Sequence, residues 1–210
     1  MTTAVVVGSG PNGLAAATVL ARAGVEVTVF EAHQEIGGGA RTIHSPLPGL
    51  VQDHCAAVHP MAAGSEYMAS WELEKRGVRW LRAPIDAAHP LDDGSIAVLH
   101  QSIDKTAAGL GADGGRWRAM FGSAARNFPA LSEDIFQPML RIPRHPFLLG
   151  RFGIVAGPPP TWTRHLLRTP QGRALFTGVA AHAINRIDRP LVGGIGAGII
   201  AAGHAVGWPV

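Results

Sequence analysis

The sequence predicts an α/β fold in which a βαβ unit opens the chain and a mostly helical region follows it. Three observations predict this arrangement. Residues 4–7 form an uncharged, β-branched run, which is typical of a strand buried on both faces. Residues 14–23 are rich in alanine, as a helix would be, and Gly24 follows as a common terminating residue. Residues 25–30 then read as a second strand, which ends at Glu31.

A glycine-rich turn joins the first strand to the helix, and it fits the pattern G-x-G-x-x-G at Gly8, Gly10 and Gly13. The first glycine allows a tight turn, the second lets a pyrophosphate approach the backbone, and the third lets the helix pack closely. The start of the helix presents free N–H groups and a positive dipole end to phosphates. The pattern therefore predicts a Rossmann-type dinucleotide site, and we include the intervening Pro11 and Asn12 among its cofactor-binding residues.

An acidic residue closes the second strand at the spacing that this fold uses. Glu31 lies 18 positions after Gly13, close to the expected separation of about 20. Its carboxylate can accept hydrogen bonds from a ribose diol. The same negative charge would repel a 2′-phosphate, which argues against NADP.

A second glycine cluster follows the second strand. Gly37 and Gly38 precede Arg41, with Gly39 and Ala40 between them. The glycines indicate another close approach of backbone to ligand, and Arg41 can offer a cation to phosphates or to a flavin edge. The alternative is an ordinary glycine loop with a surface arginine.

Taken together, residues 5–10, residues 31–32 and residues 37–42 resemble the FAD-binding N-terminus of the amine oxidase and phytoene desaturase superfamily. Residues 53–60 resemble its phytoene dehydrogenase-like branch, which includes the pyridine nucleotide-disulfide oxidoreductase domain 2 proteins. The resemblance implies a glutathione reductase-like FAD-binding domain with an inserted, mostly helical substrate lobe. It implies FAD as the cofactor, with its contacts at Gly8, Gly10, Gly13, Glu31, Gly37, Gly38 and Arg41. Members of the superfamily are longer, so we expect a chain truncated at its C-terminus.

Two domains are expected, a partial FAD-binding domain over residues 1–85 and a partial substrate lobe over residues 86–210. The lobe begins with a hairpin around the turn residues at 92–94 and continues as helices. Residues 143–160, which contain five prolines, are expected to be mostly loop. Residues 191–206 are apolar but short and glycine-rich, which favours a buried helix over a membrane span.

The resemblance implies an FAD-dependent oxidoreductase that passes a hydride equivalent from a C–H bond of an apolar or amine-like substrate to flavin. In such an enzyme the cofactor carries the chemistry, and no residue here stands out as a catalytic acid or base. No metal site is expected, because Cys55 is the sole cysteine and the histidines lack ligand spacing. Two alternatives stay open: a dinucleotide-binding module or degenerate fragment without turnover, and an NAD-dependent dehydrogenase. The second glycine cluster disfavours the latter.

Charge is distributed unevenly along the chain. The net charge is +3, yet no Asp or Glu occurs between Asp134 and Asp188, an interval with seven arginines. A solvated helical face is the simplest interpretation, and an anionic membrane surface or anionic ligand is the alternative. Nucleic acid is not expected, because no recognised binding motif accompanies the arginines. The N-terminus carries no targeting signal, so we expect a cytoplasmic protein that binds a small-molecule substrate, with possible peripheral membrane contact. A missing C-terminal half or a partner chain would complete it.

Overall fold

A computed structural model describes residues 1–44, 47–138 and 141–210. The chain divides into two compact units, Met1–Val58 and His59–Val210. The sequence analysis set this boundary after residue 85. In the structure residues 59–85 belong to the second unit because backbone hydrogen bonds tie them to the C-terminal residues. His59 N donates to the carbonyl of Pro209 at 2.8 Å, and Leu81 and Val210 exchange bonds of 3.0 and 2.9 Å.

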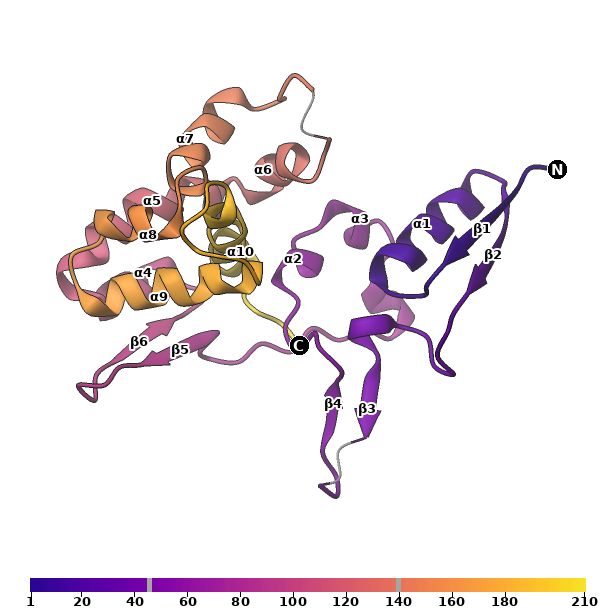
Figure 1. Cartoon of the computed structure of the whole chain (residues 1–210), viewed down its shortest axis with the longest axis horizontal. Coiled ribbons are helices and arrows are strands. Elements are labelled where there is room, and N and C mark those ends of the chain that lie inside the picture. Colours follow the sequence, from indigo (N-terminus) through magenta and orange to yellow (C-terminus); the bar gives the residue numbers. More distant parts are fainter. Residues whose placement is uncertain (45–46, 139–140) are drawn as a thin grey trace. The chain divides into compact units, whose positions relative to one another are not determined.

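The first unit contains the βαβ arrangement that the sequence predicts. Strand β1 (Thr3–Val7) leads into helix α1 (Pro11–Arg22), and β2 (Glu26–Phe30) returns beside β1 (Figure 1). The two strands are parallel and in register from Thr3 opposite Glu26 to Val7 opposite Phe30. Proline is well tolerated at the start of α1, because the first N–H groups of a helix lack intrahelical acceptors in any case.

One face of this sheet is open. Side chains alternate between the faces of a strand, and α1 covers the face of Val6, whose side chain lies near Gly13. On the other face Val7 is 85% exposed and Phe30 is 59% exposed. The expectation of a first strand buried on both faces is therefore wrong, because α1 shields only one of them.

After β2 the chain forms a short 3-10 helix, η1 (Gly38–Ala40), and an antiparallel pair, β3 (Thr42–His44) with β4 (Val51–Asp53). Sequence analysis did not predict this pair. The residues after β4 return to the glycine cluster, because the N–H groups of Cys55 and Ala56 donate to the carbonyl of Gly39 at 2.9 and 3.1 Å.

The second unit begins with short helical pieces and the predicted hairpin. The pieces are α2 (Pro60–Ala63), α3 (Glu66–Ala69) and the 3-10 helix η2 (Leu73–Arg76). The hairpin pairs β5 (Ala87–Pro90) with β6 (Ile96–Leu99). Its turn is closed by Gly94, whose N–H donates to the carbonyl of Leu91 at 3.0 Å.

Helices make up the rest of the second unit. In chain order they are α4 (Ile103–Gly109), η3 (Gly111–Asp113), α5 (Gly114–Arg126), α6 (Phe128–Ile135), α7 (Pro146–Ala156), α8 (Pro160–Thr163), η4 (Arg164–Leu166), α9 (Pro170–Ala180), η5 (Ala181–Ala183) and α10 (Val192–Val206). Helix α7 replaces the loop expected over residues 143–160. The prolines allow it, because Pro143 precedes the helix, Pro146 occupies its first turn, and the remaining three follow its end.

Helix α10 is the central element of this core and packs against α5, α7 and α9. Ala197, Ile200 and Ala201 are completely buried, as expected for a small-residue core helix. Glycine allows the close approach to α9, because a Cβ at Gly196 would lie 2.6 Å from the Cα of Ala180. Within the described ranges, none of the helices combines the length and the apolar character needed to cross a bilayer.

A buried carboxylate links the start of α5 to the start of α9. Asp113 accepts backbone N–H bonds from Arg168 at 2.8 Å and Thr169 at 2.7 Å, and the Thr169 hydroxyl donates at 2.6 Å. Burial by itself raises the pKa of Asp113, but the hydrogen bonds from Thr169 and Arg168 outweigh it and leave the pKa below its usual value. The ionised side chain therefore anchors Thr169, whose hydroxyl oxygen caps α9 by accepting from Gly172 N at 3.0 Å.

Candidate functional site

The turn between β1 and α1 has the backbone geometry of a phosphate-binding loop. Gly8 has φ +93°, a left-handed conformation that favours glycine, and its N–H donates to the carbonyl of Phe30 at 2.7 Å. A Cβ at Gly13 would collide with the carbonyl oxygen of Gly8. These two glycines thus set the turn and let the helix pack closely.

Open space lies in front of Gly10. A Cβ at this position would meet nothing nearer than the Cα of Gly38, at 3.9 Å. The first bond of α1 runs from Leu14 N to the carbonyl of Gly10 at 2.9 Å, so the N–H groups of Asn12 and Gly13 lack an intrahelical acceptor. Pro11 has no N–H to offer. Two backbone donors and a positive helix end therefore border the turn.

Glu31 is held beside this turn by Ser9. Its Oε2 accepts from the backbone N–H of Ser9 at 2.7 Å and from the Ser9 hydroxyl at 2.6 Å, and its Oε1 accepts from His33 N at 2.9 Å. The Ser9 hydroxyl is the largest cause of a pKa lowered to about 2, and the backbone N–H groups of His33 and Ser9 contribute to it. Glu31 is therefore an ionised acceptor. A carboxylate has about four lone-pair sites, so the three bonds leave capacity for one more donor.

The second glycine cluster packs directly on the first turn. Gly38 has φ +56°, and a Cβ there would lie 2.8 Å from the Cα of Gly10. The N–H of Gly37 donates to the carbonyl of Ser9 at 3.1 Å. These contacts show that the second glycine cluster packs on the first turn. This packing role is additional to the close approach of a ligand that its sequence predicts.

Arg41 follows this cluster at the end of η1. Its N–H donates to the carbonyl of Gly38 at 3.3 Å, and its own carbonyl accepts from His54 N at 2.8 Å. The backbone of Arg41 is fixed on both sides.

The structure thus brings together the predicted residues Gly8, Gly10, Gly13, Glu31, Gly37 and Gly38, with Pro11, Asn12 and Arg41 at the borders of the two loops. Sequence reasoning missed Ser9, which occupies a variable position of the motif and is 1% exposed. The pattern itself carries no signal for it, since any residue can stand between the first two glycines.

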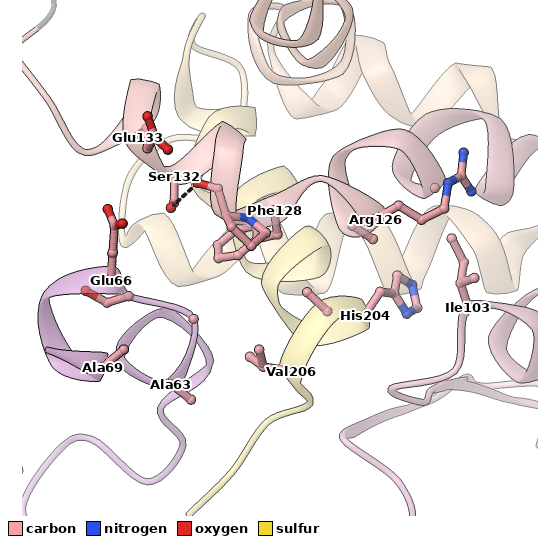
Figure 2. A pocket seen from close by; sticks show the side chains of 16 residues that line it. Ala63, Glu66, Ala69, Ile103, Arg126, Phe128, Ser132, Glu133, His204 and Val206 are labelled. Carbon is pink, nitrogen blue, oxygen red and sulfur yellow. Dashed lines mark hydrogen bonds between the residues drawn. The ribbon is translucent and has the colours of Figure 1, made fainter. Parts of the chain in front are cut away.

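The second unit contains a cavity of about 610 Å³ between α2, α3, α5, α6 and the end of α10. Most of its wall is apolar, with Ile103, Phe128 and Val206 among the larger side chains. Figure 2 shows the carboxylates of Glu66 and Glu133 on one side and the His204 ring and the Arg126 side chain on the other. The cavity can therefore accept an apolar molecule with a polar or cationic end.

His204 reaches this cavity from α10 and has a defined tautomer. Its Nε2 lies 2.8 Å from the indole Nε1 of Trp117, which can only donate, so Nε2 accepts. The ring proton therefore sits on Nδ1, which lies 3.1 Å from the carbonyl oxygen of Gln101 and donates to it. Burial is the main reason why the pKa of His204 lies below its usual value. The sequence offered only one signal for this residue, a lone histidine in an apolar run.

Comparisons with known proteins agree with this geometry. Residues 6–76 match the family described as NAD(P)-binding Rossmann-like domain. The chain is 35% identical over 101 residues to pyridine nucleotide-disulfide oxidoreductase domain-containing protein 2 of Mus musculus, and 36% identical to that of Rattus norvegicus over the same length. Each match covers 48% of this chain and 17% of the relative, so the chain matches less than a fifth of the length of these curated relatives.

Solved structures give the wider fold. Wild-type putrescine oxidase bound to putrescine superimposes with a TM-score of 0.50 at 18% identity, over 93% of this chain and 40% of that one. A triple mutant of the same enzyme gives a TM-score of 0.52 at 17% identity, over 92% and 40%.

The turn, the acid that follows β2 and these matches define the class of the first part of the chain: residues 6–76 form an NAD(P)-binding Rossmann-like domain. More particularly, 101 residues of the chain are homologous to part of pyridine nucleotide-disulfide oxidoreductase domain-containing protein 2, and the fold of the chain is similar to part of that of putrescine oxidase. The predicted α/β fold with a Rossmann-type βαβ unit and the resemblance to the pyridine nucleotide-disulfide oxidoreductase domain 2 proteins are confirmed.

Proposed function

We propose that the first unit binds FAD and that the protein is an FAD-dependent oxidoreductase. The observation that carries this proposal is the ionised Glu31, anchored by Ser9 beside the open turn at Gly10. When bound, FAD supplies an isoalloxazine that accepts a hydride equivalent from a substrate C–H bond. The residues of this chain bind and orient that group.

Each residue of the turn has a role in this proposal. The pyrophosphate faces Gly10 and the N–H groups of Asn12 and Gly13, where a side chain would otherwise stand. The ribose hydroxyls donate to the remaining acceptor capacity of Glu31. Gly38 holds the second loop against the first, and Arg41 adds a cation at its edge.

The choice among dinucleotides follows from charge and from the second loop. A carboxylate with a pKa of about 2 is ionised at every physiological pH and repels a 2′-phosphate, which disfavours NADP. The second glycine loop, which packs on the first turn through Gly38, belongs to the pattern that resembles FAD-binding proteins, and this resemblance favours FAD over NAD.

The substrate that we propose is apolar or amine-like. The cavity of the second unit supports this class, because most of its wall is apolar and the Glu66 and Glu133 carboxylates lie on the side away from Arg126. Glu133 is already paired with Arg144 at 2.9 Å, so Glu66 supplies the less compensated charge toward a cationic group.

The test is a visible absorption spectrum of the purified full chain, followed by chromatography of the supernatant released by heat. The expected result is a flavin spectrum and FAD in the supernatant, or uptake of added FAD by colourless protein. Titrations with NAD and NADP serve as comparisons. Binding of NAD in preference to FAD would support a nicotinamide-dependent dehydrogenase instead. If the protein takes up FAD but neither apolar nor amine substrates reduce the bound flavin, it would be a binding module.

A further inference from the structure

The cavity of the second unit has two ends of opposite charge. Figure 2 shows the Glu66 carboxylate on one side of its lining and the Arg126 side chain on the other, with the Phe128 ring between them in this view. Both charged residues are exposed, so they lie where a ligand can reach them from solvent. The wall between the two ends is mostly apolar and includes Phe128, Ile103 and Val206.

The other polar side chains of the lining already have partners. The Ser132 hydroxyl donates to a backbone carbonyl at 2.7 Å, and the Ser65 hydroxyl accepts a backbone N–H of α3 at 3.5 Å. Both ring nitrogens of His204 are hydrogen-bonded to other residues. Glu133 is paired with Arg144 at 2.9 Å. None of these groups therefore offers a ligand an uncompensated charge.

Glu66 and Arg126 differ from the rest of the lining in this respect. Among the residues that the structure describes, neither the Glu66 carboxylate nor the Arg126 guanidinium has a hydrogen-bond or ion-pair partner. The pKa of Arg144 is raised chiefly by its hydrogen bond to Glu133, and the charge of Glu66 is the smallest of the causes that raise it. Two carboxylates at this end of the cavity therefore share one arginine, and the end is acidic.

A glycine leaves room for the Arg126 guanidinium against the wall of the cavity. Gly122 and Arg126 are one helical turn apart on α5, and both line the cavity. A Cβ at Gly122 would lie 3.2 Å from Nη1 of Arg126 and 3.7 Å from Cδ1 of Ile103. The guanidinium thus lies beside an apolar side chain of the wall, where it can meet an anionic group at that end of the cavity.

We propose that this cavity binds an apolar chain with an amine at one end and a carboxylate at the other, that is, an ω-amino carboxylate. The ammonium group lies beside Glu66, and the carboxylate accepts from the guanidinium of Arg126, whose N–H donors form a fixed fork. The single charge of Arg126 matches a carboxylate better than a phosphate monoester, which carries nearly two negative charges. As a statement about the substrate of an enzyme, this inference rests on the proposed function. As a statement about what the cavity binds, it holds without the flavin.

The test is isothermal titration calorimetry of the full chain, without added FAD, with ω-aminooctanoic acid, octylamine and octanoic acid at about pH 7.5. The probes have the same number of carbon atoms and differ in their charged ends. We expect ω-aminooctanoate to bind about fivefold more tightly than either of the others, because each single-ended probe leaves one exposed charge pair unmade. Raising the salt concentration should narrow both differences in affinity.

Two variants should give a crossed pattern that a loss of folding would not produce. Glu66→Gln should remove the preference for ω-aminooctanoate over octanoate while it keeps the binding of octanoate. Arg126→Gln should remove the preference over octylamine while it keeps the binding of octylamine. Matched controls are Glu74→Gln and Arg79→Gln, both exposed and outside the lining of the cavity, and they should keep both preferences.

Three results would overturn the proposal. The first is a chain that binds none of the probes. The second is ω-aminooctanoate binding no more tightly than octylamine or octanoate. The third is a parent-like pattern of preferences in Glu66→Gln and Arg126→Gln, which would mean that water alone solvates the two charges.

Uptake of FAD is measured on the same preparations, so this inference and the proposed function fail separately. A chain that holds FAD but shows no preference for ω-aminooctanoate would contradict the inference alone. A chain that shows the preference but takes up no FAD would keep the binding site and lose the assignment as a flavin enzyme.

Discussion

Trp117 and His204 are joined by a hydrogen bond of 2.8 Å that ties α5 to the last turn of α10. Because Trp117 donates, His204 must keep Nε2 unprotonated for the bond to exist. A second proton on the ring would remove this acceptor and place a charge in a buried position. The charge state of one histidine is thus coupled to the packing of the helical core.

Stability of the second unit should therefore fall in mild acid. Burial lowers the folded-state pKa of His204, so the unfolded chain takes up a proton first as the pH drops. The contribution of neutral His204 to the free energy of unfolding is complete above about pH 6.5, the pKa of histidine in the unfolded chain. It is lost as the pH falls from there toward the lower pKa of the folded state. Urea unfolding at about pH 7.5 and about pH 5.5 measures the effect. His204→Gln keeps an acceptor for Trp117 and should flatten the pH dependence, whereas His165→Gln at an exposed position should leave it intact. Equal pH dependence in all three chains would contradict the assignment.

Two glycines of α10 should respond in opposite directions to alanine. Gly196→Ala places a Cβ 2.6 Å from the Cα of Ala180, and we expect a loss of about 1–3 kcal/mol in the free energy of unfolding. Gly194→Ala meets nothing nearer than 3.7 Å and should gain up to about 1 kcal/mol from helix propensity. Urea denaturation of the two variants checks the pair. Similar values for both would mean that α9 and α10 do not depend on this contact.

Glu31→Gln should weaken FAD binding by about 10- to 100-fold, because a hydrogen bond from ribose to a charged acceptor becomes one to a neutral amide. Flavin fluorescence quenching measures the dissociation constant. Glu35→Gln, an exposed carboxylate in the same loop, is the matched control and should bind as the parent chain does. Unchanged affinity in Glu31→Gln would rule out the ribose contact while leaving the fold assignment in place. In the same variant NADP should bind less poorly than it does to the parent, since the repelling charge is gone.

Gly38→Ala tests the contact between the two glycine loops. The substitution forces a left-handed alanine, which costs about 1–2 kcal/mol, and also drives a Cβ to 2.8 Å from Gly10. Gly24→Ala carries the same left-handed penalty at φ +80° but meets nothing within 4 Å. Only Gly38→Ala should lower both the thermal stability of the first unit and its affinity for FAD. If Gly24→Ala reduced FAD affinity as much, the loop contact would have no specific role.

The parts of the fold that sequence predicted are those specified by local chemistry. Gly8 and Gly13 have their roles within a few residues of each other, and the strand expected over residues 25–30, with Glu31 at its end, is recognised without reference to the rest of the chain. Helix α7 was missed because prolines at both ends resemble a loop, although Pro146 stands where a helix tolerates it. The bond between Ser9 and Glu31 spans 22 residues, and His204 meets Trp117 over 87, so no local pattern reports either pair.

The uncovered face of β1 and β2 bears on how long such a chain persists in a cell. A two-stranded sheet shielded on one side has little stability of its own, and its backbone opens more readily than that of a core helix such as α10. A dinucleotide that binds only the folded sheet, and not the opened one, stabilises the folded form by mass action. Proteases act on the opened form, so chains that have captured the nucleotide outlast those that have not. The abundance of this chain would then follow the supply of the dinucleotide that we propose it binds.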